Sequence, residues 1–242
     1  MCGIFGCIAD EAAGRVLEGL RRLEYRGYDS AGLAALYSGH EGPVKTERTT
    51  GYVADLVSKA NGRFTGTNIA IGHTRWATHG RVSDSNAHPH SSSDGAITIV
   101  HNGIIENASE LLEVVENLGY TVKSETDSEI VVHLLDHELK TQPSNDTPLS
   151  AFHSTIQKLR GSWAIAVVMS GLDGILIARN GAPMVVGRGH ECVCVSSDVQ
   201  PLYSCCSEVA YLNDGDVFLV HARGISQPGD LPTPQFGAIQ GV

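Results

Sequence analysis

A cysteine at position 2 is the feature of this sequence that most directly suggests chemistry. The chain begins Met1-Cys2-Gly3, and a methionine in front of a small residue is normally removed, which would leave Cys2 first. An N-terminal cysteine carries a thiol nucleophile and, on the same Cα, a free α-amine whose unperturbed pKa of about 7.7–8.0 suits a general base. The alternative is a buried cysteine in a first strand, since a free thiol packs as a small hydrophobic group.

A second segment offers the groups that stabilise negative charge on an amide under attack. His101-Asn102-Gly103 directly follows an apolar run at residues 96–100. A strand that breaks into Asn-Gly can direct the Asn102 side-chain amide and the Gly103 backbone N–H toward one point, as an oxyanion hole requires. The alternative is a β-turn, because Asn-Gly is a strong turn signal.

Two charged residues could hold a substrate with charges of its own. Arg75, in the segment 72–80, has a planar guanidinium that pairs with a carboxylate through two parallel hydrogen bonds, although a surface ion pair is the alternative. Its neighbour Trp76 would be a gate or a core residue. Asp127, within the acidic segment 124–129, either pairs with a substrate ammonium or, with Thr126, caps the helix that follows.

The histidines and cysteines do not predict a metal site. The spacings of His73, His79, His88 and His90 fit no compact ligand set, and the helical pair His133 and His137 lacks the glutamate of a zinc-hydrolase helix. The remaining cysteines, apart from Cys2 and Cys7, form the pairs Cys192-x-Cys194 and Cys205-Cys206, which differ from paired C-x2-C knuckles. Packing on one face of a strand is the simpler interpretation of the first pair, so we expect no metal and no cofactor.

Composition excludes several classes of function. The 242 residues include 17 basic and 27 acidic ones, a net charge of −10, and no basic cluster that would bind nucleic acid or an anionic membrane. No apolar run approaches the ~20 residues that span a bilayer, and the N-terminus does not resemble a signal peptide. We therefore expect a cytoplasmic protein with free thiols.

The elements that must position these residues alternate between strands and helices. Short apolar runs predict strands at residues 2–8, 31–37, 68–72, 96–100, 163–169, 174–179, 184–187, 192–196 and 216–221. Helical spacing of apolar residues predicts helices at 12–23, 51–60, 105–118, 127–139 and 149–159. The long polar stretch 74–95 between two strands is typical of a functional loop.

This order predicts an α+β domain, in which two packed sheets with helices outside is one of the possible layer arrangements. The length fits one large domain or two small ones. Residues 227–242 contain three prolines and three glycines, and we expect them to be a linker toward a part of a longer protein.

Six motifs, in register over residues 2 to about 221, together resemble one family. They are MCGIFG at the start, RRLEYRGYDSAG at 21–32, GHTRWATHG at 72–80, NAHPH at 86–90, HNGIIEN at 101–107 and SETDSE at 124–129. They resemble the glutaminase domains of the glucosamine-6-phosphate synthases, which are N-terminal-nucleophile (class II) glutamine amidotransferases. The resemblance implies a four-layer αββα sandwich over residues 1–226, with 227–242 leading toward sugar-isomerase domains that bind fructose-6-phosphate.

The resemblance also implies a role for each matching residue. Cys2 would form a γ-glutamyl thioester with L-glutamine, with its own α-amine as base and then acid, and Asn102 and Gly103 would form the oxyanion hole. Arg75 would hold the α-carboxylate of glutamine and Asp127 its α-ammonium. The residues implied to line, close or flank the pocket are Trp76, Thr78, His79, Arg26 and Gly27.

Without sugar-isomerase domains, this chain is expected to release ammonia from glutamine and not to make the amino sugar. A homodimer of the full-length enzyme is a further expectation. The alternatives are the glutaminase domain of another class II amidotransferase, an N-terminal-cysteine amidase for other linear amides, and a glutamine-binding regulatory domain without turnover. An amidase of the penicillin or bile-salt acylase kind would need an apolar acyl pocket, which the Arg75 and Asp127 pair disfavours.

Overall fold

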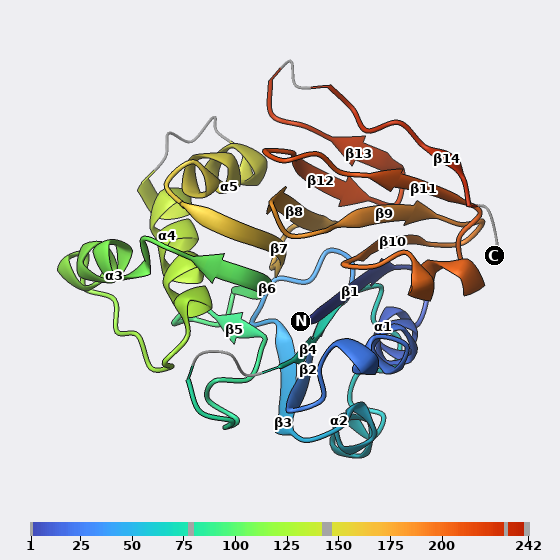
Figure 1. Ribbon diagram of the computed structural model, residues 1–242, viewed down its shortest axis with the longest axis horizontal. Helices are drawn as coiled ribbons and strands as arrows, with labels where there is room; N and C mark the ends of the chain where they lie inside the picture. The colour runs from blue at the N-terminus through green and yellow to red at the C-terminus, as the bar shows by residue number, and fades with distance from the viewer. Residues whose placement is uncertain (1, 77–79, 142–146, 230–231, 240–242) are drawn as a thin grey trace.

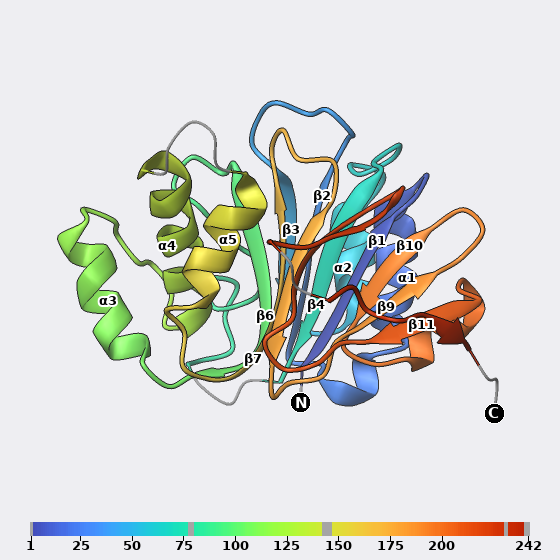
Figure 2. The ribbon, with the colours of Figure 1, turned by 90° about the horizontal axis from the view of Figure 1, so that it is seen from above.

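Two antiparallel sheets packed face to face form the centre of the molecule, with helices on both outer faces (Figures 1 and 2). The computed structural model describes residues 2–76, 80–141, 147–229 and 232–239. Within these ranges the first sheet has the strand order β14-β11-β9-β10-β1-β4-β2-β3 and the second β13-β12-β8-β7-β6-β5. This arrangement confirms the predicted α+β class and the αββα layers.

The elements have the following bounds. The first sheet contains β1 (Gly3–Ile8), β2 (Ser30–Leu36), β3 (Lys45–Thr50), β4 (Ile69–Arg75), β9 (Val185–Arg188), β10 (Val193–Ser196), β11 (Glu208–Tyr211) and β14 (Gly237–Ala238). The second contains β5 (His90–Ser91), β6 (Ile97–Ile105), β7 (Gly161–Met169), β8 (Ile175–Asn180), β12 (Val217–His221) and β13 (Gly224–Ser226). The helices are α1 (Ala12–Arg21), α2 (Val53–Ala60), α3 (Ala108–Asn117), α4 (Asp127–Thr141) and α5 (Pro148–Ile156), with 3-10 turns η1 (Glu24–Arg26) and η2 (Gln200–Ser204).

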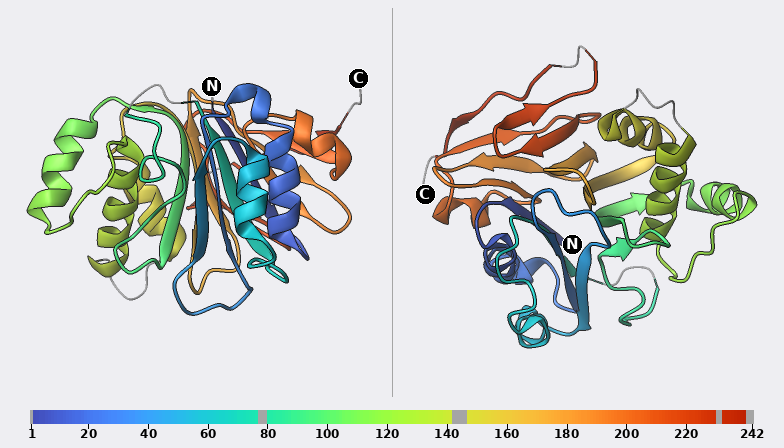
Figure 3. Two further views of the ribbon diagram at one scale, coloured as in Figure 1. Left: turned by 90° about the horizontal axis from the view of Figure 1, so that it is seen from below. Right: turned by 180° about the vertical axis from the view of Figure 1, so that it is seen from behind.

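Strand β7 shows why the chain folds in four layers. Its side chains alternate between two apolar clusters, because successive residues of a strand point to opposite faces. Ile165 and Val167 pack under the helices α4 and α5, whereas Ala166 and Val168 pack between the two sheets. A strand that is apolar on both faces, as β7 is, must be covered on both faces (Figure 3).

On the other side of the molecule, α1 covers the first sheet through a close helix-strand contact. Its buried face includes Val16, Gly19 and Leu20. Gly19 lies directly over Phe5 of β1, and a Cβ at position 19 would come within 2.5 Å of the Phe5 ring. The absence of a side chain at Gly19 therefore lets α1 pack directly on the strand that follows Cys2.

The structure corrects the expected bounds around the second sheet. The strand expected at 96–100 continues to Ile105, and its pairing with β7 is unbroken from Ile97 opposite Met169 to Ile105 opposite Gly161. His101-Asn102-Gly103 thus lies inside β6 and is not a β-turn. The helix expected at 105–118 begins at Ala108, because the backbone of residues 97–105 is engaged in the sheet.

Five of the strands that the structure describes were not predicted from the sequence. β3 (Lys45–Thr50) is a polar edge strand on β2, and the short strands β5, β11, β13 and β14 also lie at or near sheet edges. Edge strands are often short and charged, so they lack the apolar run that makes a central strand recognisable. β14 lies within residues 227–242, the expected linker, and pairs with β11 through Glu208 opposite Ala238.

The sheets bring three strands together at one end of the molecule. β1 pairs with β4 so that Gly3 lies opposite Thr74, which places Cys2 beside the end of β4. Both strands also approach β6 of the other sheet. Residues from both sheets can therefore reach one point next to Cys2. In the part of the chain that the structure describes, no helix is long and apolar enough to cross a membrane.

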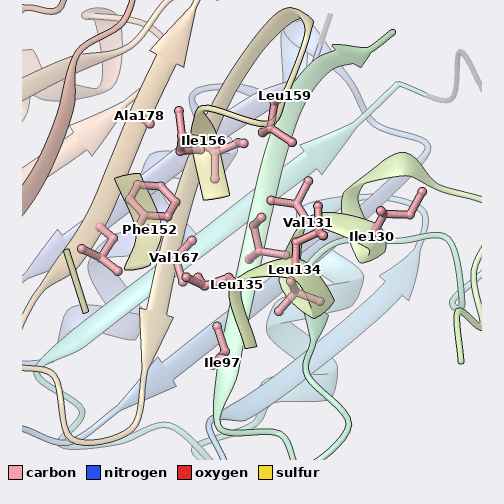
Figure 4. Close-up of a cluster of buried hydrophobic side chains, with 14 of the residues drawn as sticks. Ile97, Ile130, Val131, Leu134, Leu135, Phe152, Ile156, Leu159, Val167 and Ala178 are labelled. Atoms are coloured by element: carbon pink, nitrogen blue, oxygen red, sulfur yellow. The ribbon is translucent and has the colours of Figure 1, made fainter. Parts of the chain in front are cut away.

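The cluster beneath α4 and α5 gives a stability prediction. Phe152 is fully buried there against β7 and α4 residues (Figure 4). Replacing it with alanine leaves a cavity, so we expect Phe152→Ala to lower the free energy of unfolding by about 3–5 kcal/mol. Urea denaturation measures the change. Val114→Ala on the exposed face of α3 is the control, with an expected change of less than about 0.5 kcal/mol, and equal changes in both variants would contradict this account of the core.

Candidate active site

A cavity of about 440 Å³ opens beside Cys2, between the end of β4, strand β6 and the start of α4. Its lining includes five residues that were singled out from the sequence: Cys2, Arg75, Trp76, Gly103 and Asp127. These residues are far apart in the sequence, and the two sheets bring them together. The cavity is therefore lined by a thiol, by one buried cation and by the Asp127 carboxylate, with the carboxylates of Glu106 and Glu125 also on its border.

The Cys2 thiol is held at the mouth of this cavity by the backbone of Trp76. The Trp76 N–H donates to Cys2 Sγ over 3.4 Å. Burial raises the pKa of the Cys2 thiol, against the lowering effects of this hydrogen bond and of the Arg75 and Arg26 charges. A thiol with a raised pKa is protonated near neutral pH, so it requires a base before it can act as a nucleophile.

Asn102 is oriented toward Cys2 by a buried histidine. His73 Nε2 lies 3.0 Å from the His101 carbonyl oxygen and 2.9 Å from Asn102 Oδ1. A carbonyl accepts hydrogen bonds and never donates them, so Nε2 must carry the proton and the Asn102 atom facing it must be oxygen. The Asn102 Nδ2 group therefore points the other way, where it donates to the Cys2 carbonyl oxygen over 3.1 Å.

Gly103 follows Asn102 at a position that excludes any side chain. Its φ angle is +113°, and a Cβ would lie 2.0 Å from the Ser162 carbonyl oxygen and 2.8 Å from Trp163 Cα. Glycine is the residue that adopts such a φ without strain. Gly103 borders the cavity, and because it has no side chain, its backbone is not covered on that side.

Asp127 is fixed as a carboxylate at the start of α4. Its Oδ2 accepts the Ile105 N–H over 2.9 Å, and its Oδ1 lies 3.5 Å from His101 Nδ1. Burial by itself would raise the pKa of Asp127, but the contacts with His101, Ile105 and Ser128 outweigh it and lower the pKa to about 2. Asp127 is therefore a fixed negative charge throughout the neutral range, as well as the first residue of its helix.

Arg75 is the buried cation on the opposite wall of the cavity. It is 5% exposed, and its Nη1 donates to the Arg81 carbonyl oxygen over 3.3 Å. Its own backbone is held by β2 and by the Asp29 N–H, which donates to the Arg75 carbonyl oxygen. A buried guanidinium has lost most of its water, so an anion in this cavity would interact with it strongly.

Arg26 and Gly27 support this wall from behind. Arg26 is buried and pairs with Asp198 over 2.8 Å, so its guanidinium is engaged by the protein. Gly27 passes so close to the end of β4 that a Cβ there would lie 2.8 Å from the Arg75 carbonyl carbon and the Trp76 nitrogen. Gly27 thus supports the backbone of Arg75 and Trp76, and neither Arg26 nor Gly27 is among the described residues that border the cavity.

Trp76 is more than two-fifths exposed and packs edge-on against Tyr28, with ring centroids 5.3 Å apart. It borders the cavity, so of the two interpretations open from the sequence the core position is wrong. The other two residues expected to close the pocket, Thr78 and His79, lie outside the described residues.

A network of buried histidines, of which His88 and His101 border the cavity, was not recognised as a unit from the sequence. His88 Nε2 and His101 Nδ1 both contact the Ser128 hydroxyl over 2.8 Å, and the rings of His73 and His88 pack at a tilt of 32° with centroids 4.2 Å apart. Burial lowers the pKa of His73 to about 3 and that of His88 well below its usual range. The imidazoles of His73 and His88 are therefore neutral hydrogen-bonding groups, which contact Asn102 and Ser128 of α4 respectively.

A further contact fixes the segment in front of α4. The Asn86 side chain donates to Glu125 Oε2 over 2.9 Å and accepts the Glu125 N–H over 2.9 Å. Glu125 Oε2 also accepts the Arg81 N–H. The motifs NAHPH and SETDSE therefore meet in space, although neither residue could be assigned a role from the sequence. Glu125 borders the same cavity, so this pairing shapes its rim.

Comparison with known proteins identifies the relatives of this chain. The profile of the glutamine amidotransferase domain family matches residues 73–204. The chain is 42% identical over 228 residues to a glutamine–fructose-6-phosphate aminotransferase (isomerizing) of Shewanella oneidensis, covering 93% of this chain and 36% of the relative. It is 43% identical to the protein of that name from Chlorobaculum tepidum, covering 91% of this chain and 36% of the relative. The chain thus spans about a third of the length of these relatives.

A solved structure shares the fold. The glutamine phosphoribosylpyrophosphate amidotransferase of Bacillus subtilis, in complex with ADP and GMP, superposes with a TM-score of 0.78 at 22% sequence identity. The match covers 93% of this chain and 48% of that one. At this level of identity the comparison supports the αββα fold.

The low pKa of Asp127 gives a prediction for stability against pH. A carboxylate with a lowered folded-state pKa contributes stability that is present above its unfolded pKa, near 4, and is lost as the pH falls through about 2. In Asp127→Asn we therefore expect a smaller loss of unfolding free energy between pH about 4 and 2, by about 2 kcal/mol. Urea denaturation across this range measures it. The control is Glu113→Gln on the exposed face of α3. If the unfolding free energy of Asp127→Asn falls between these pH values as much as that of the unaltered chain, the lowered pKa of Asp127 is refuted.

Proposed function

The chain belongs to the glutamine amidotransferase domain family, and we propose that it hydrolyses L-glutamine to glutamate and ammonia with Cys2 as nucleophile. The observation that carries this proposal is the single cavity bordered by Cys2, Arg75 and Asp127. Glutamine is a zwitterion with a neutral side-chain amide. Its recognition requires a cation, an anion and an uncharged site at the amide, and Arg75 and Asp127 supply the two charges on the border of this cavity.

We assign the two charged residues to the two charged groups of the substrate. The Arg75 guanidinium would hold the α-carboxylate through parallel hydrogen bonds, and the Asp127 carboxylate would hold the α-ammonium. The low pKa of Asp127 keeps it ionised at any pH at which the substrate is a zwitterion. With both ends of the amino acid fixed, the side-chain amide would extend toward Cys2.

The first chemical step would be attack by the Cys2 sulfur on the amide carbon. After removal of Met1, the α-amine of Cys2 would take the thiol proton, since the thiol itself has a raised pKa and is not ionised at rest. The carbonyl oxygen would gain negative charge as the carbon–sulfur bond forms. Collapse of this intermediate would break the carbon–nitrogen bond, with the α-ammonium returning the proton to the leaving ammonia and a γ-glutamyl thioester remaining.

The second step would be hydrolysis of the thioester. Water would attack the same carbon while the Cys2 α-amine takes a water proton, and the carbon–sulfur bond would then break to give glutamate and the free thiol. In both steps the developing oxyanion would be stabilised by Asn102 Nδ2 and the Gly103 N–H. An amide nitrogen carries two hydrogens, and Asn102 uses one for the Cys2 carbonyl, so the second remains for the oxyanion.

We further propose that this activity supplies ammonia for glucosamine-6-phosphate synthesis. The support is the 42–43% identity to relatives named glutamine–fructose-6-phosphate aminotransferase (isomerizing), of which the chain covers 36%. The remaining length would contain the sugar-isomerase domains that bind fructose-6-phosphate, with residues 227–242 leading toward them. Cytoplasmic location and a homodimeric full-length enzyme belong to the same proposal.

Removal of the nucleophile tests the reaction itself. We expect Cys2→Ala to lower kcat for glutamine hydrolysis by about a thousand-fold or more, since no other group would form the thioester. Glutamate release is measured with a coupled dehydrogenase assay on chain from which Met1 has been removed. Cys7→Ala, which removes another thiol from the same strand, should keep activity within about threefold. Unchanged turnover in Cys2→Ala would exclude the mechanism, and glutamine binding without any turnover in the unaltered chain would favour a regulatory role.

Substrate analogues test the assignment of Arg75 and Asp127. Asp127→Asn should raise the KM for glutamine by about 10- to 100-fold and should leave the use of glutaramate, which lacks the α-amine, almost unchanged. Arg75→Gln should show the opposite preference, losing glutamine but not 4-aminobutanamide, which lacks the carboxylate. Steady-state kinetics of both variants on three amides provide the comparison. Equal losses of activity on all three amides would show that Arg75 and Asp127 do not bind the carboxylate and the ammonium of the substrate. A preference of the unaltered chain for N-acyl amides would favour another class of amidase.

A further inference from the structure

Four cysteines that the proposed reaction does not use meet in space. The sulfur atoms of Cys192, Cys194, Cys205 and Cys206 all lie within 4.8 Å of one another. Two of these residues come from the start of β10 and two from the end of η2, segments that lie side by side on the first sheet. The fifth thiol, Cys7 of β1, lies opposite Cys194 in the sheet register and 3.4 Å from its sulfur.

The cluster is separate from the candidate active site. Cys7 of β1 comes five residues after Cys2, which corresponds to about 17 Å along an extended chain. The four-cysteine cluster borders the α1 side of the first sheet, together with Leu202 and Val209, whereas the cavity at Cys2 opens toward β6 and α4. Whatever the cluster binds would therefore not contact the substrate of the proposed reaction.

The spacing of the sulfurs fits one tetrahedral metal ion. Zinc bound by four thiolates has Zn–S bonds of about 2.3 Å, which places the sulfurs of a regular tetrahedron about 3.8 Å apart. The Cys205 and Cys206 sulfurs are 3.7 Å apart, and those of Cys194 and Cys205 are 4.0 Å apart. Sulfurs this close leave room for one ion in the middle but not for a cluster with inorganic sulfide, whose cysteine ligands lie farther apart.

Glycines make the space in which the sulfurs gather. A Cβ on Gly187 would lie 2.7 Å from Cys206 Sγ, and a Cβ on Gly189 would lie 2.9 Å from Cys192 Sγ and 2.1 Å from the Cys205 carbonyl oxygen. Both positions face the cluster from β9 and the turn that follows it. A side chain at either one would fill the position of a sulfur. Two glycines thus leave this pocket to the thiols alone.

We propose that Cys192, Cys194, Cys205 and Cys206 bind one zinc ion in a closed tetrathiolate site. Binding would release the protons that the four thiols still carry and would form four Zn–S bonds. Four protein ligands leave no open position, so the ion would be structural and would tie η2 to β10. Cys7 would remain outside the site and would donate a hydrogen bond to the Cys194 thiolate. This proposal does not depend on the proposed function.

Two surface hollows give the ion a route to the site. One, of about 450 Å³, is bordered by α1 residues and by Cys194 and Cys205. The other is bordered by Cys192 together with Arg188 and Glu191. Cys205 and Cys206 are themselves half-buried. The thiols can therefore exchange a metal without unfolding of the sheet.

Metal content and the spectrum of the cobalt form test the site directly. The full chain is purified under anaerobic, reducing conditions without a metal-affinity tag, incubated with excess Zn²⁺, desalted and analysed by inductively coupled plasma mass spectrometry. We expect one zinc per chain. Replacement of zinc by Co²⁺ should give an intense thiolate-to-cobalt charge-transfer band and visible bands of the tetrahedral type.

Matched cysteine variants identify the ligands. Cys192→Ser and Cys205→Ser should each abolish stoichiometric zinc retention and the cobalt bands, whereas Cys2→Ala and Cys7→Ala should keep both. A folded wild-type chain that retains no zinc after this treatment would overturn the proposal, as would zinc that disappears in Cys2→Ala. A disulfide between two of the four cysteines in the reduced preparation, found by peptide mass, would also overturn it. Glutamine hydrolysis by the same samples is a separate readout, so failure of the zinc site leaves the proposed function untouched.

Discussion

The hydrogen bonds from His73 through Asn102 to Cys2 are the interaction on which the site depends. His73 lies on β4 of one sheet, Asn102 lies on β6 of the other, and the carbonyl of Cys2 accepts the final hydrogen bond. The chain of contacts thus joins the two sheets at the one place where the cavity opens. It also fixes which end of the Asn102 amide faces the nucleophile, because the His101 carbonyl forces His73 Nε2 to be a donor.

Burial keeps His73 neutral while it makes this interaction. A charged imidazole would be costly in this position, so the pKa of His73 falls to about 3 and the ring remains a neutral donor at physiological pH. Desolvation lowers the pKa of a histidine but raises that of a carboxyl group. At Asp127, the hydrogen bonds to the carboxylate outweigh this rise, so the carboxylate stays ionised. A neutral region beside Cys2 is therefore placed between a fixed cation and a fixed anion.

The sequence predicts the central elements of the fold because they bury apolar residues with a clear period. The strands around β7 and the helices α1, α4 and α5 are recognisable for this reason. Edge strands such as β3 are not, since their residues are polar and their partners lie elsewhere in the chain. His101-Asn102-Gly103 carries the signal of a turn, yet its pairing with β7 keeps it in the strand, because tertiary pairing outweighs a local preference.

Motifs in the sequence single out Cys2, Arg75, Gly103 and Asp127, which the structure gathers around one cavity, but they do not indicate the contacts that support these residues. The contact of Asn86 with Glu125, the packing of His73 against His88 and the meeting of four cysteines each join segments that are distant in sequence or irregularly spaced. The cysteine pairs in particular have no recognised ligand spacing along the chain, and they come together because η2 folds back onto β10. Such groupings follow from the packing of the two sheets and not from any local pattern.

The measurement that most directly tests the account is the intact mass of the chain before and after treatment with 6-diazo-5-oxo-L-norleucine, a reactive glutamine analogue. If Cys2 is an N-terminal nucleophile in a glutamine site, the untreated chain has lost Met1, and treatment adds one equivalent that peptide mass places on Cys2. Excess L-glutamine should protect against the reaction. An adduct on another residue, or equal labelling of a chain that retains Met1, would contradict the central claim.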